Sequence, residues 1–186
     1  MKLKGLEKTG SGKYLKHYRL IYENMAGHEK GYEIVSHAEM DDPAQLGTKV
    51  SGVSIVAYCG ERMLLLREFR MGVNRYIYNL CAGMLEDGET VEDCVRRELY
   101  EETGLRLIRM IDELRPSFAA VSLSDIKNRV IFAEVEGEIE EHASENEDIT
   151  ARLYTREEVA KLVENEDFSS RAQVAAYFFA KSGKVC

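Results

Sequence analysis

The sequence predicts an α/β fold, a layered sandwich of strands and helices. Short segments that alternate apolar and polar residues, typical of strands, are interspersed with three segments whose apolar residues recur at helical spacing. At 186 residues the chain is long enough for one good core and a small extra element. These patterns indicate the fold class, but they do not select the order of the strands.

The first section, residues 1–48, is expected to be a small antiparallel β element of three short strand-like pieces. Residues 17–25 alternate along a strand, and residues 31–38 resemble another strand after the turn signal at Ala26 and Gly27. The acidic pair before Pro43 breaks this pattern. We therefore expect a β-rich N-terminal element at 1–48 and the main domain at 49–186.

The main domain is predicted to alternate strands with helices. Apolar runs and alternation predict strands at 50–58, 62–69, 76–81, 107–114, 129–136 and 149–154. Helical spacing predicts helices at 91–103, 156–165 and about 170–181, with Thr155 as the N-cap of the second. The apolar residues of the last helix are Val174, Ala175, Phe178 and Phe179, and the two phenylalanines are interpreted as packing residues.

The helix at 91–103 carries the clearest local signals. Thr90 followed by Asp93 fits a capping box, and Gly104 fits a left-handed residue after the last turn. One side of this helix is an apolar stripe that can face a core, made of Val91, Cys94, Val95 and Leu99.

The other side of this helix gathers carboxylates. Glu98, Glu101 and Glu102 stand at i, i+3 and i+4, so their side chains leave from neighbouring positions of one surface. Like charges so placed repel, which makes sense mainly if a hard cation sits among the oxygens. We expect Mg2+, with Mn2+ as the alternative, and a further acidic group, Glu89, beside the N-terminal end of the helix.

Charge and composition narrow the function classes. The net charge of -8 argues against a surface that wraps nucleic acid, because phosphate binding of that kind needs clustered Lys and Arg. A small phosphorylated ligand remains compatible, since it needs only local positive charge and a metal.

The sequence also favours a cytoplasmic protein without a membrane partner. It has no apolar stretch of about 18 residues, and its first residues lack the apolar core of a signal peptide. The four cysteines show no CxxC spacing and are interpreted as reduced, without a zinc site or a disulfide framework.

The run GMLEDGETVEDCVRRELYEETGL resembles the signature of the Nudix hydrolases, G-x5-E-x7-R-E-U-x-E-E-x-G-U with U aliphatic. At average composition such a match arises by accident on the order of once in a million chains of this size. A solvated acidic helix is the simpler alternative, but it does not explain the two glycines and the arginine at their spacing. The matching residues are Gly83, Glu89, Arg97, Glu98, Leu99, Glu101, Glu102, Gly104 and Leu105.

The resemblance implies a fold and a metal site. It implies an α/β/α sandwich with a mixed sheet between helices, in which the signature forms a loop, a helix and a loop. Glu98 and Glu102, helped by Glu101 and the backbone carbonyl of Ala82, would hold two or three Mg2+ ions. The resemblance implies structural roles for four further motif residues, Gly83, Glu89, Arg97 and Gly104. Arg97 would pair with Glu89.

The flanks resemble ADP-ribose pyrophosphatases and related nucleotide-sugar hydrolases. An arginine at the position of Arg70 contacts the substrate in that branch, and the acidic segment 143–149 resembles its closing loop. Glu145 or Glu147 would act as the general base, and Glu101 is also assigned to catalysis. Asn79 stands where the branch carries a Glu, so it is expected at the substrate but without that negative charge.

The expected reaction is Mg2+-dependent hydrolysis of the diphosphate bond of a nucleoside diphosphate sugar. ADP-ribose is the best guess, and GDP-mannose is the nearest rival, because the proline common beyond the signature in ADP-ribose enzymes is missing here. A nucleotide-sugar sensor that does not cut its ligand and a nucleoside triphosphate hydrolase are further alternatives. The retained carboxylates favour an enzyme over the sensor.

The resemblance also implies a homodimer, in which the N-terminal sheet is exchanged and adds an aromatic residue to the base pocket. The candidates for that aromatic are Tyr14, Tyr18, Tyr22 and Tyr32. Nothing in the sequence chooses among them, and core packing is the preferred interpretation of each.

Overall fold

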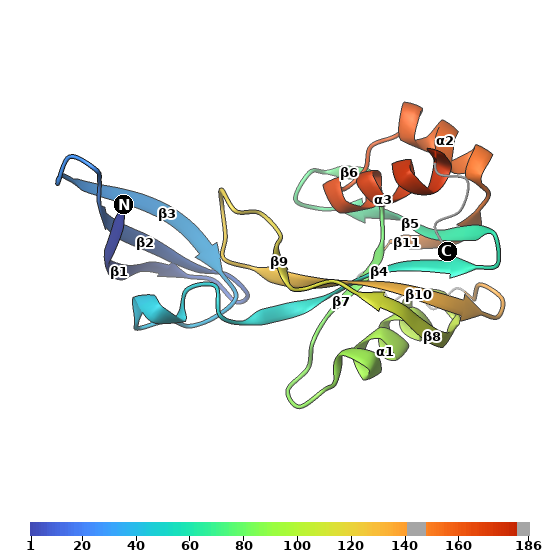
Figure 1. The fold of residues 1–186 in the computed structure, drawn as a ribbon, viewed down its shortest axis with the longest axis horizontal. Coiled ribbons are helices and arrows are strands. Elements are labelled where there is room, and N and C mark those ends of the chain that lie inside the picture. The colour runs from blue at the N-terminus through green and yellow to red at the C-terminus, as the bar shows by residue number, and fades with distance from the viewer. Residues whose placement is uncertain (141–147, 182–186) are drawn as a thin grey trace. The chain divides into compact units, whose positions relative to one another are not determined.

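The computed structural model describes residues 1–140 and 148–181, which form two compact units (Figure 1). The first unit contains residues 1–52 and 115–129, and the second contains the rest. Each unit has buried apolar clusters of its own. Among the described helices, none has the length and apolar character needed to cross a membrane.

The first unit is built on an antiparallel sheet in the order β1-β2-β3, as the alternating pattern predicted. Its strands are β1 (Lys2–Ser11), β2 (Lys16–Glu23) and β3 (Glu29–Ser36), and the short 3-10 helix η1 (Pro43–Gln45) follows them. Tyr18 is fully buried; its hydroxyl accepts a hydrogen bond from the Met40 N–H at 2.7 Å and donates one to the Ala38 carbonyl at 3.2 Å. Tyr18 is therefore a core residue of this sheet.

The second unit is a sheet with helices on both faces, which confirms the predicted α/β class. The sheet order is β11-β5-β4-β10-β8, with β6 added to β5, β7 to β4 and β9 to β10. In Figure 1, β4 and β10 run in the same direction, whereas β5 is antiparallel to β11 and β4, so the sheet is mixed. Its strands are β4 (Val50–Cys59), β5 (Arg62–Arg70), β6 (Arg75–Asn79), β7 (Cys81–Met84), β8 (Arg106–Glu113), β9 (Ser117–Phe118), β10 (Lys127–Glu136) and β11 (Ile149–Tyr154).

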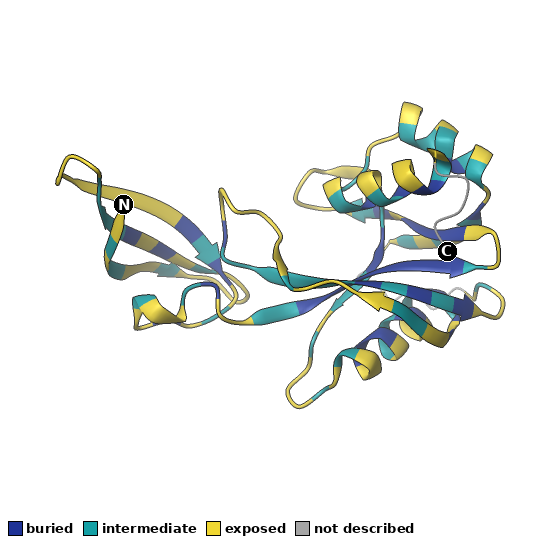
Figure 2. Ribbon diagram, viewed as in Figure 1, coloured by how far each residue is buried: buried dark blue, intermediate teal, exposed yellow. Residues whose placement is uncertain are grey.

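Two apolar clusters hold the helices against this sheet. Helix α1 (Val91–Thr103) packs its buried residues, including Leu99, against Leu64 and Leu66 of β5. Helices α2 (Arg156–Asn165) and α3 (Ser170–Lys181) belong to the other cluster, with Met63 and Leu65 of the same strand. Because alternate side chains of a strand point to opposite faces, β5 supplies both cores. Figure 2 shows the buried strands between these helices.

The predicted strand at 76–81 is wrong, because the structure divides the segment between two partners. Asn79 ends β6, which pairs with β5, and Cys81 begins β7, which pairs with β4. Between them Leu80 is buried, and its backbone N–H donates to the Asn79 side-chain oxygen at 2.9 Å. That side-chain bond satisfies a backbone donor at the break.

Some predicted packing residues are exposed. In α3 the buried residues are Ala172, Ala176 and Phe179, which share one face at helical spacing. Val174 and Phe178 lie off that face, with more than half of each exposed, so the packing role predicted for Phe178 is wrong. Tyr14 is likewise 71% exposed, so it does not pack in a core either.

We predict that Gly104→Ala destabilises the protein more than Gly60→Ala. Both glycines have positive φ, +72° and +57°, which costs an alanine about 1 kcal/mol. An added Cβ at Gly104 would also lie 2.7 Å from the Glu140 Cβ, whereas nothing lies within 4 Å at Gly60. Urea unfolding should show a loss of about 1 kcal/mol for Gly60→Ala and at least about 2 kcal/mol for Gly104→Ala. Equal losses would show that the contact with Glu140 is unimportant.

Candidate active site

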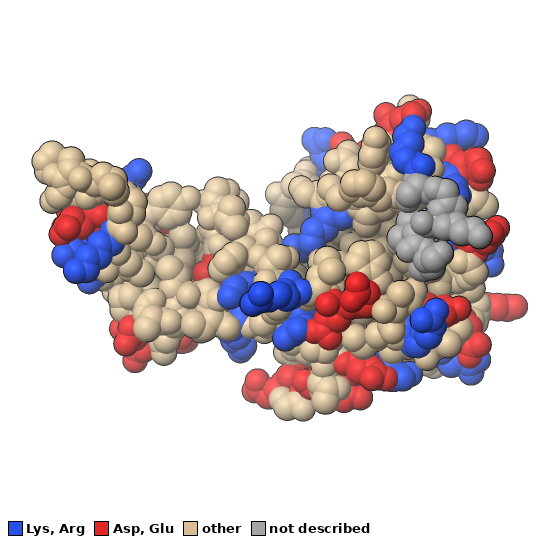
Figure 3. Space-filling model, in the orientation of Figure 1, with Lys and Arg blue, Asp and Glu red and all other residues tan. Residues whose placement is uncertain are grey.

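Helix α1 is oriented by its cap and its buried face. The Thr90 hydroxyl oxygen accepts from the Asp93 N–H at 3.2 Å, and Gly104 ends the helix in the left-handed conformation, as predicted. The Asp93 carboxylate accepts from the Thr90 hydroxyl at 2.6 Å and not from the Thr90 backbone N–H, so the predicted capping box is only half formed. Cys94, Val95 and Leu99 are fully buried against the sheet. The carboxylates on the other side of the helix are thereby turned away from the core, and Figure 3 shows acidic side chains gathered over α1 and the loop before it.

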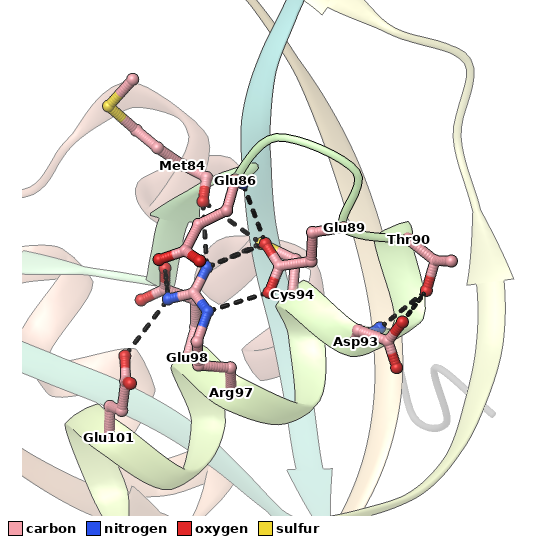
Figure 4. Close-up of polar contacts among 9 residues, drawn as sticks. All are labelled: Met84, Glu86, Glu89, Thr90, Asp93, Cys94, Arg97, Glu98 and Glu101. Carbon is pink, nitrogen blue, oxygen red and sulfur yellow. Dashed lines mark hydrogen bonds and ion pairs between the residues drawn. The ribbon is translucent and has the colours of Figure 1, made fainter.

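Arg97 lies at the centre of these carboxylates (Figure 4). Its guanidinium grips Glu89 with two hydrogen bonds, of 2.9 Å from Nε and 3.0 Å from Nη2. Nη1 donates to Glu98 at 2.7 Å and to Glu101 at 3.2 Å, while Nη2 also donates to the Met84 carbonyl at 3.0 Å. The expected ion pair between Arg97 and Glu89 is present, and Arg97 also fastens the loop before α1 to the helix.

This network shifts the pKa of the groups within it. The hydrogen bonds from Arg97 lower the pKa of Glu89 to about 2, assisted by the Glu86 backbone N–H. The same bonds raise the pKa of Arg97. Glu89 therefore stays ionised across the physiological range, and it holds the loop rather than exchanging protons.

Gly83 makes room for the carboxylate of Glu98. A Cβ added at Gly83 would overlap the Glu98 carboxyl group, so no other residue fits without moving that side chain. The Glu98 side chain is only 12% exposed, and its burial raises its pKa despite the Arg97 bond. Gly83 thus allows a carboxylate to rest directly on the backbone of β7.

Glu102 is the most strongly perturbed carboxyl group of the helix. Its Oε2 accepts from the Ala82 backbone N–H at 3.2 Å. Burial raises its pKa to about 8, and the nearby charges of Glu98 and Glu68 add to the shift, while hydrogen bonds from Cys81 and Ala82 oppose it. Within the described residues, no positive charge lies close enough to Glu102 to offset this rise in its pKa.

These residues fit a divalent cation in their chemistry. Glu98 and Glu102 are one helical turn apart, both beside β7 through Gly83 and Ala82, and both offer the hard oxygen donors that Mg2+ prefers. Within the residues that the structure describes, no three His, Cys, Asp or Glu side chains form a complete cage. A cation there would draw further oxygens from water or from substrate phosphates.

Two further predicted site residues, Glu101 and Arg70, are less enclosed. Glu101 is 57% exposed, and its recorded partner is Arg97. Arg70, at the end of β5, is 58% exposed, and its Nη1 lies 3.5 Å from Glu68 Oε2. Glu145 and Glu147, the predicted general bases, lie outside the described residues.

Asn79 contacts Glu68, a residue that sequence reasoning missed. The Asn79 amide donates to Glu68 Oε1 at 2.6 Å, and its oxygen accepts from Ser169 Oγ at 2.6 Å. Glu68 itself is only 6% exposed. A signal was available, because Glu68 follows Leu64 and Leu66 at strand spacing and so lies on a core-facing position.

We predict that Glu102→Gln raises stability in EDTA at pH 8. The folded pKa of about 8 exceeds the ordinary 4.5, so between these values the folded state binds more protons and wild-type stability falls as pH rises. Gln does not ionise and should gain on the order of a few kcal/mol at pH 8, but almost nothing below pH 4.5. Urea unfolding from pH 4 to 8.5 measures this difference, and a constant difference would refute the burial effect.

Comparisons with known proteins agree with this geometry. ADP-ribose pyrophosphatase of Escherichia coli K12 is 31% identical over 105 residues, 54% of this chain and 50% of that protein. The namesake in Bacillus subtilis is 28% identical over 164 residues, covering 87% of this chain and 82% of that one. ADP compounds hydrolase NudE of E. coli K12 is 26% identical over 72% of each chain. This chain spans about half the length of the E. coli ADP-ribose pyrophosphatases that it matches.

A solved structure shares the fold. The crystal structure of an ADP compounds hydrolase superposes with a TM-score of 0.72 at 23% identity, covering 96% of this chain and 92% of that one. Residues 48–177, well over half of the chain, match the NUDIX domain. With the signature residues assembled around α1 and the fold shared, the chain belongs to the NUDIX domain family.

Proposed function

We propose that this protein hydrolyses the diphosphate bond of a nucleoside diphosphate sugar with the help of Mg2+ or Mn2+. The observation that carries the proposal is the pair Glu98 and Glu102, held one turn apart beside Gly83 and Ala82. Carboxylates arranged in this way offer a divalent cation hard donors, and a diphosphate needs such a cation. Nudix hydrolases generally use a divalent metal.

ADP-ribose is the proposed substrate, with AMP and ribose 5-phosphate as products. The names of three relatives, two ADP-ribose pyrophosphatases and an ADP compounds hydrolase, favour an ADP-containing ligand. GDP-mannose is the alternative substrate, because the proline common beyond the signature in ADP-ribose enzymes is missing from this chain. We also propose a homodimer, from the resemblance, and a cytoplasmic location, from the sequence.

The residues would share the work as follows. Glu98 and Glu102, aided by Glu101 and the Ala82 carbonyl, would hold the cations, while Arg97 fixes Glu98 relative to Glu89. When bound, a divalent cation supplies neutralisation of the phosphate oxygens and a lower pKa for the attacking water.

The remaining steps belong to other residues of the chain. Arg70 would meet a substrate phosphate with guanidinium N–H groups that its contact with Glu68 leaves open. Glu145 or Glu147, outside the described residues, would take the proton of the attacking water.

The function is tested with a substrate panel. Purified protein is incubated with ADP-ribose, GDP-mannose, NADH, diadenosine polyphosphates or dGTP, in Mg2+, in Mn2+ and in EDTA, and the products are identified. Fastest turnover of ADP-ribose, abolished by EDTA, is expected, and oxygen-18 water then locates the attacked phosphorus. Tight binding of one compound with no turnover of any would favour a sensor and contradict the proposal.

We predict that Glu102→Gln lowers kcat for ADP-ribose by about a hundredfold or more, because it removes a charge that serves the metal. The control is Glu92→Gln on the same helix, whose carboxylate pairs with Arg96 at 2.6 Å on the exposed side. It should change kcat by less than about twofold. Near-normal turnover of Glu102→Gln in Mg2+ would remove Glu102 from the site.

We also predict that Gly83→Ala lowers kcat by about tenfold or more, because the new methyl group must displace the Glu98 carboxylate. Gly72→Ala is the matched control, since nothing lies within 4 Å of a Cβ there and its φ is not in the left-handed region. Steady-state kinetics with circular dichroism separates lost activity from lost fold. Unchanged kcat in a folded Gly83→Ala protein would show that the position of Glu98 does not matter.

A further inference from the structure

Glu68 is a buried carboxylate that the proposed chemistry does not use. It follows Leu64 and Leu66 on the face of β5 that packs in the α1 core, and its side chain is only 7% exposed. A charge in such a place is costly unless hydrogen bonds or an opposite charge compensate it. Its partners therefore indicate what the residue does.

The two oxygens of Glu68 reach in different directions. Oε1 accepts a hydrogen bond of 2.6 Å from the Asn79 side-chain amide on the neighbouring strand β6. Oε2 lies 3.5 Å from Nη1 of Arg70, two residues further along β5. One carboxylate thus joins a half-buried amide to an exposed guanidinium.

Hydrogen bonds hold the Asn79 side chain in this arrangement. Its oxygen accepts from Ser169 Oγ at 2.6 Å and from the Leu80 backbone N–H at 2.9 Å, while its amide donates to Glu68. Turning Asn79 toward a ligand would break these bonds and leave buried polar groups without partners. These bonds make Asn79 suited to holding Glu68 in place.

Arg70 is suited to receiving an anion. Its guanidinium carries five N–H donors in a planar fork that matches a phosphate, and its side chain is 58% exposed. In the described part of the chain, Glu68 is its one recorded ion pair. A long exposed side chain whose guanidinium is already held at one nitrogen loses less freedom when it binds.

We propose that Glu68 is a positioning residue for substrate, which orients the Arg70 guanidinium toward a phosphate of the nucleotide and is itself held by Asn79 and Ser169. This inference rests on the proposed function. Asn79 stands where the ADP-ribose pyrophosphatase branch carries a Glu, and in this inference Glu68 supplies the negative charge that Asn79 cannot. The inference also assigns Asn79 to the support of Glu68 in place of the substrate contact that the sequence suggested.

The test compares Glu68→Gln with wild type. Gln keeps the shape and can still accept from Asn79, but it loses the charge that holds Arg70. KM for ADP-ribose should rise about fivefold with kcat within about twofold, as expected when binding common to substrate and transition state is lost. Asn79→Ala should raise KM in the same direction.

A double-mutant cycle separates positioning from general stability. Arg70→Ala, a change at an exposed position, should raise KM about tenfold. Adding Glu68→Gln to Arg70→Ala should then change KM by less than about 1.5-fold, because the residue that it positions is gone. Independent, additive effects of the two substitutions would overturn the inference.

Glu134→Gln is the matched control, since it breaks a 2.7 Å ion pair with Arg109 on another part of the sheet and should leave KM unchanged. Calorimetric binding of ADP-ribose in EDTA provides a readout that does not need turnover. If wild type binds ADP-ribose in EDTA but hydrolyses it in neither Mg2+ nor Mn2+, the proposed function fails, yet a weaker Kd in Glu68→Gln would still support positioning. Equal Kd values for the two proteins, or no binding by wild type, would overturn the inference.

Discussion

The site depends on the ion pairs between the Arg97 guanidinium and the carboxylates around it. Three acidic side chains, Glu89, Glu98 and Glu101, converge on one guanidinium. Without it they would repel one another on a single helical surface. Arg97 lets the loop before α1 fold back on the helix, which in turn keeps Glu98 over Gly83.

Arg97 does not compensate the negative charge of one carboxyl group, that of Glu102. Among the described residues, the donors to Glu102 are neutral, the Ala82 N–H and the Cys81 thiol, and burial raises its pKa to about 8. Glu89, which the arginine grips with two bonds, moves in the opposite direction to about 2. One short stretch of chain thus separates carboxylates that hold the structure from those available to a cation.

Much of the fold followed from periodicity and capping. The helix bounds at Val91, Thr103, Arg156 and Asn165 agree with the prediction, because capping residues and apolar stripes act locally. The break at Leu80 could not be foreseen, since it depends on which strands lie next to 75–84 in space. Phe178 was misjudged for a similar reason: sequence shows that a residue is apolar, but only the packed sheet shows which face of α3 it covers.

The site was predictable to the same extent. The signature placed Glu89 and Arg97 together, as the structure has them, because a fixed spacing along a loop and helix determines their meeting. The role of Glu68 was missed because it depends on hydrogen bonds made by Asn79 of β6. Asn79 bonds in turn to Ser169, which is 90 positions further along the chain. Long-range hydrogen bonds of this kind leave little trace in a single sequence.

The division between β6 and β7 has a consequence for how this chain can change length. Only Leu80 separates the strand that carries Asn79 from the strand that carries Ala82 and Gly83. Inserting or deleting one residue there would turn the side chains that follow to the opposite face of the sheet. Length variation among related chains should therefore fall in the exposed turn at 71–74, where the backbone is not tied to either core.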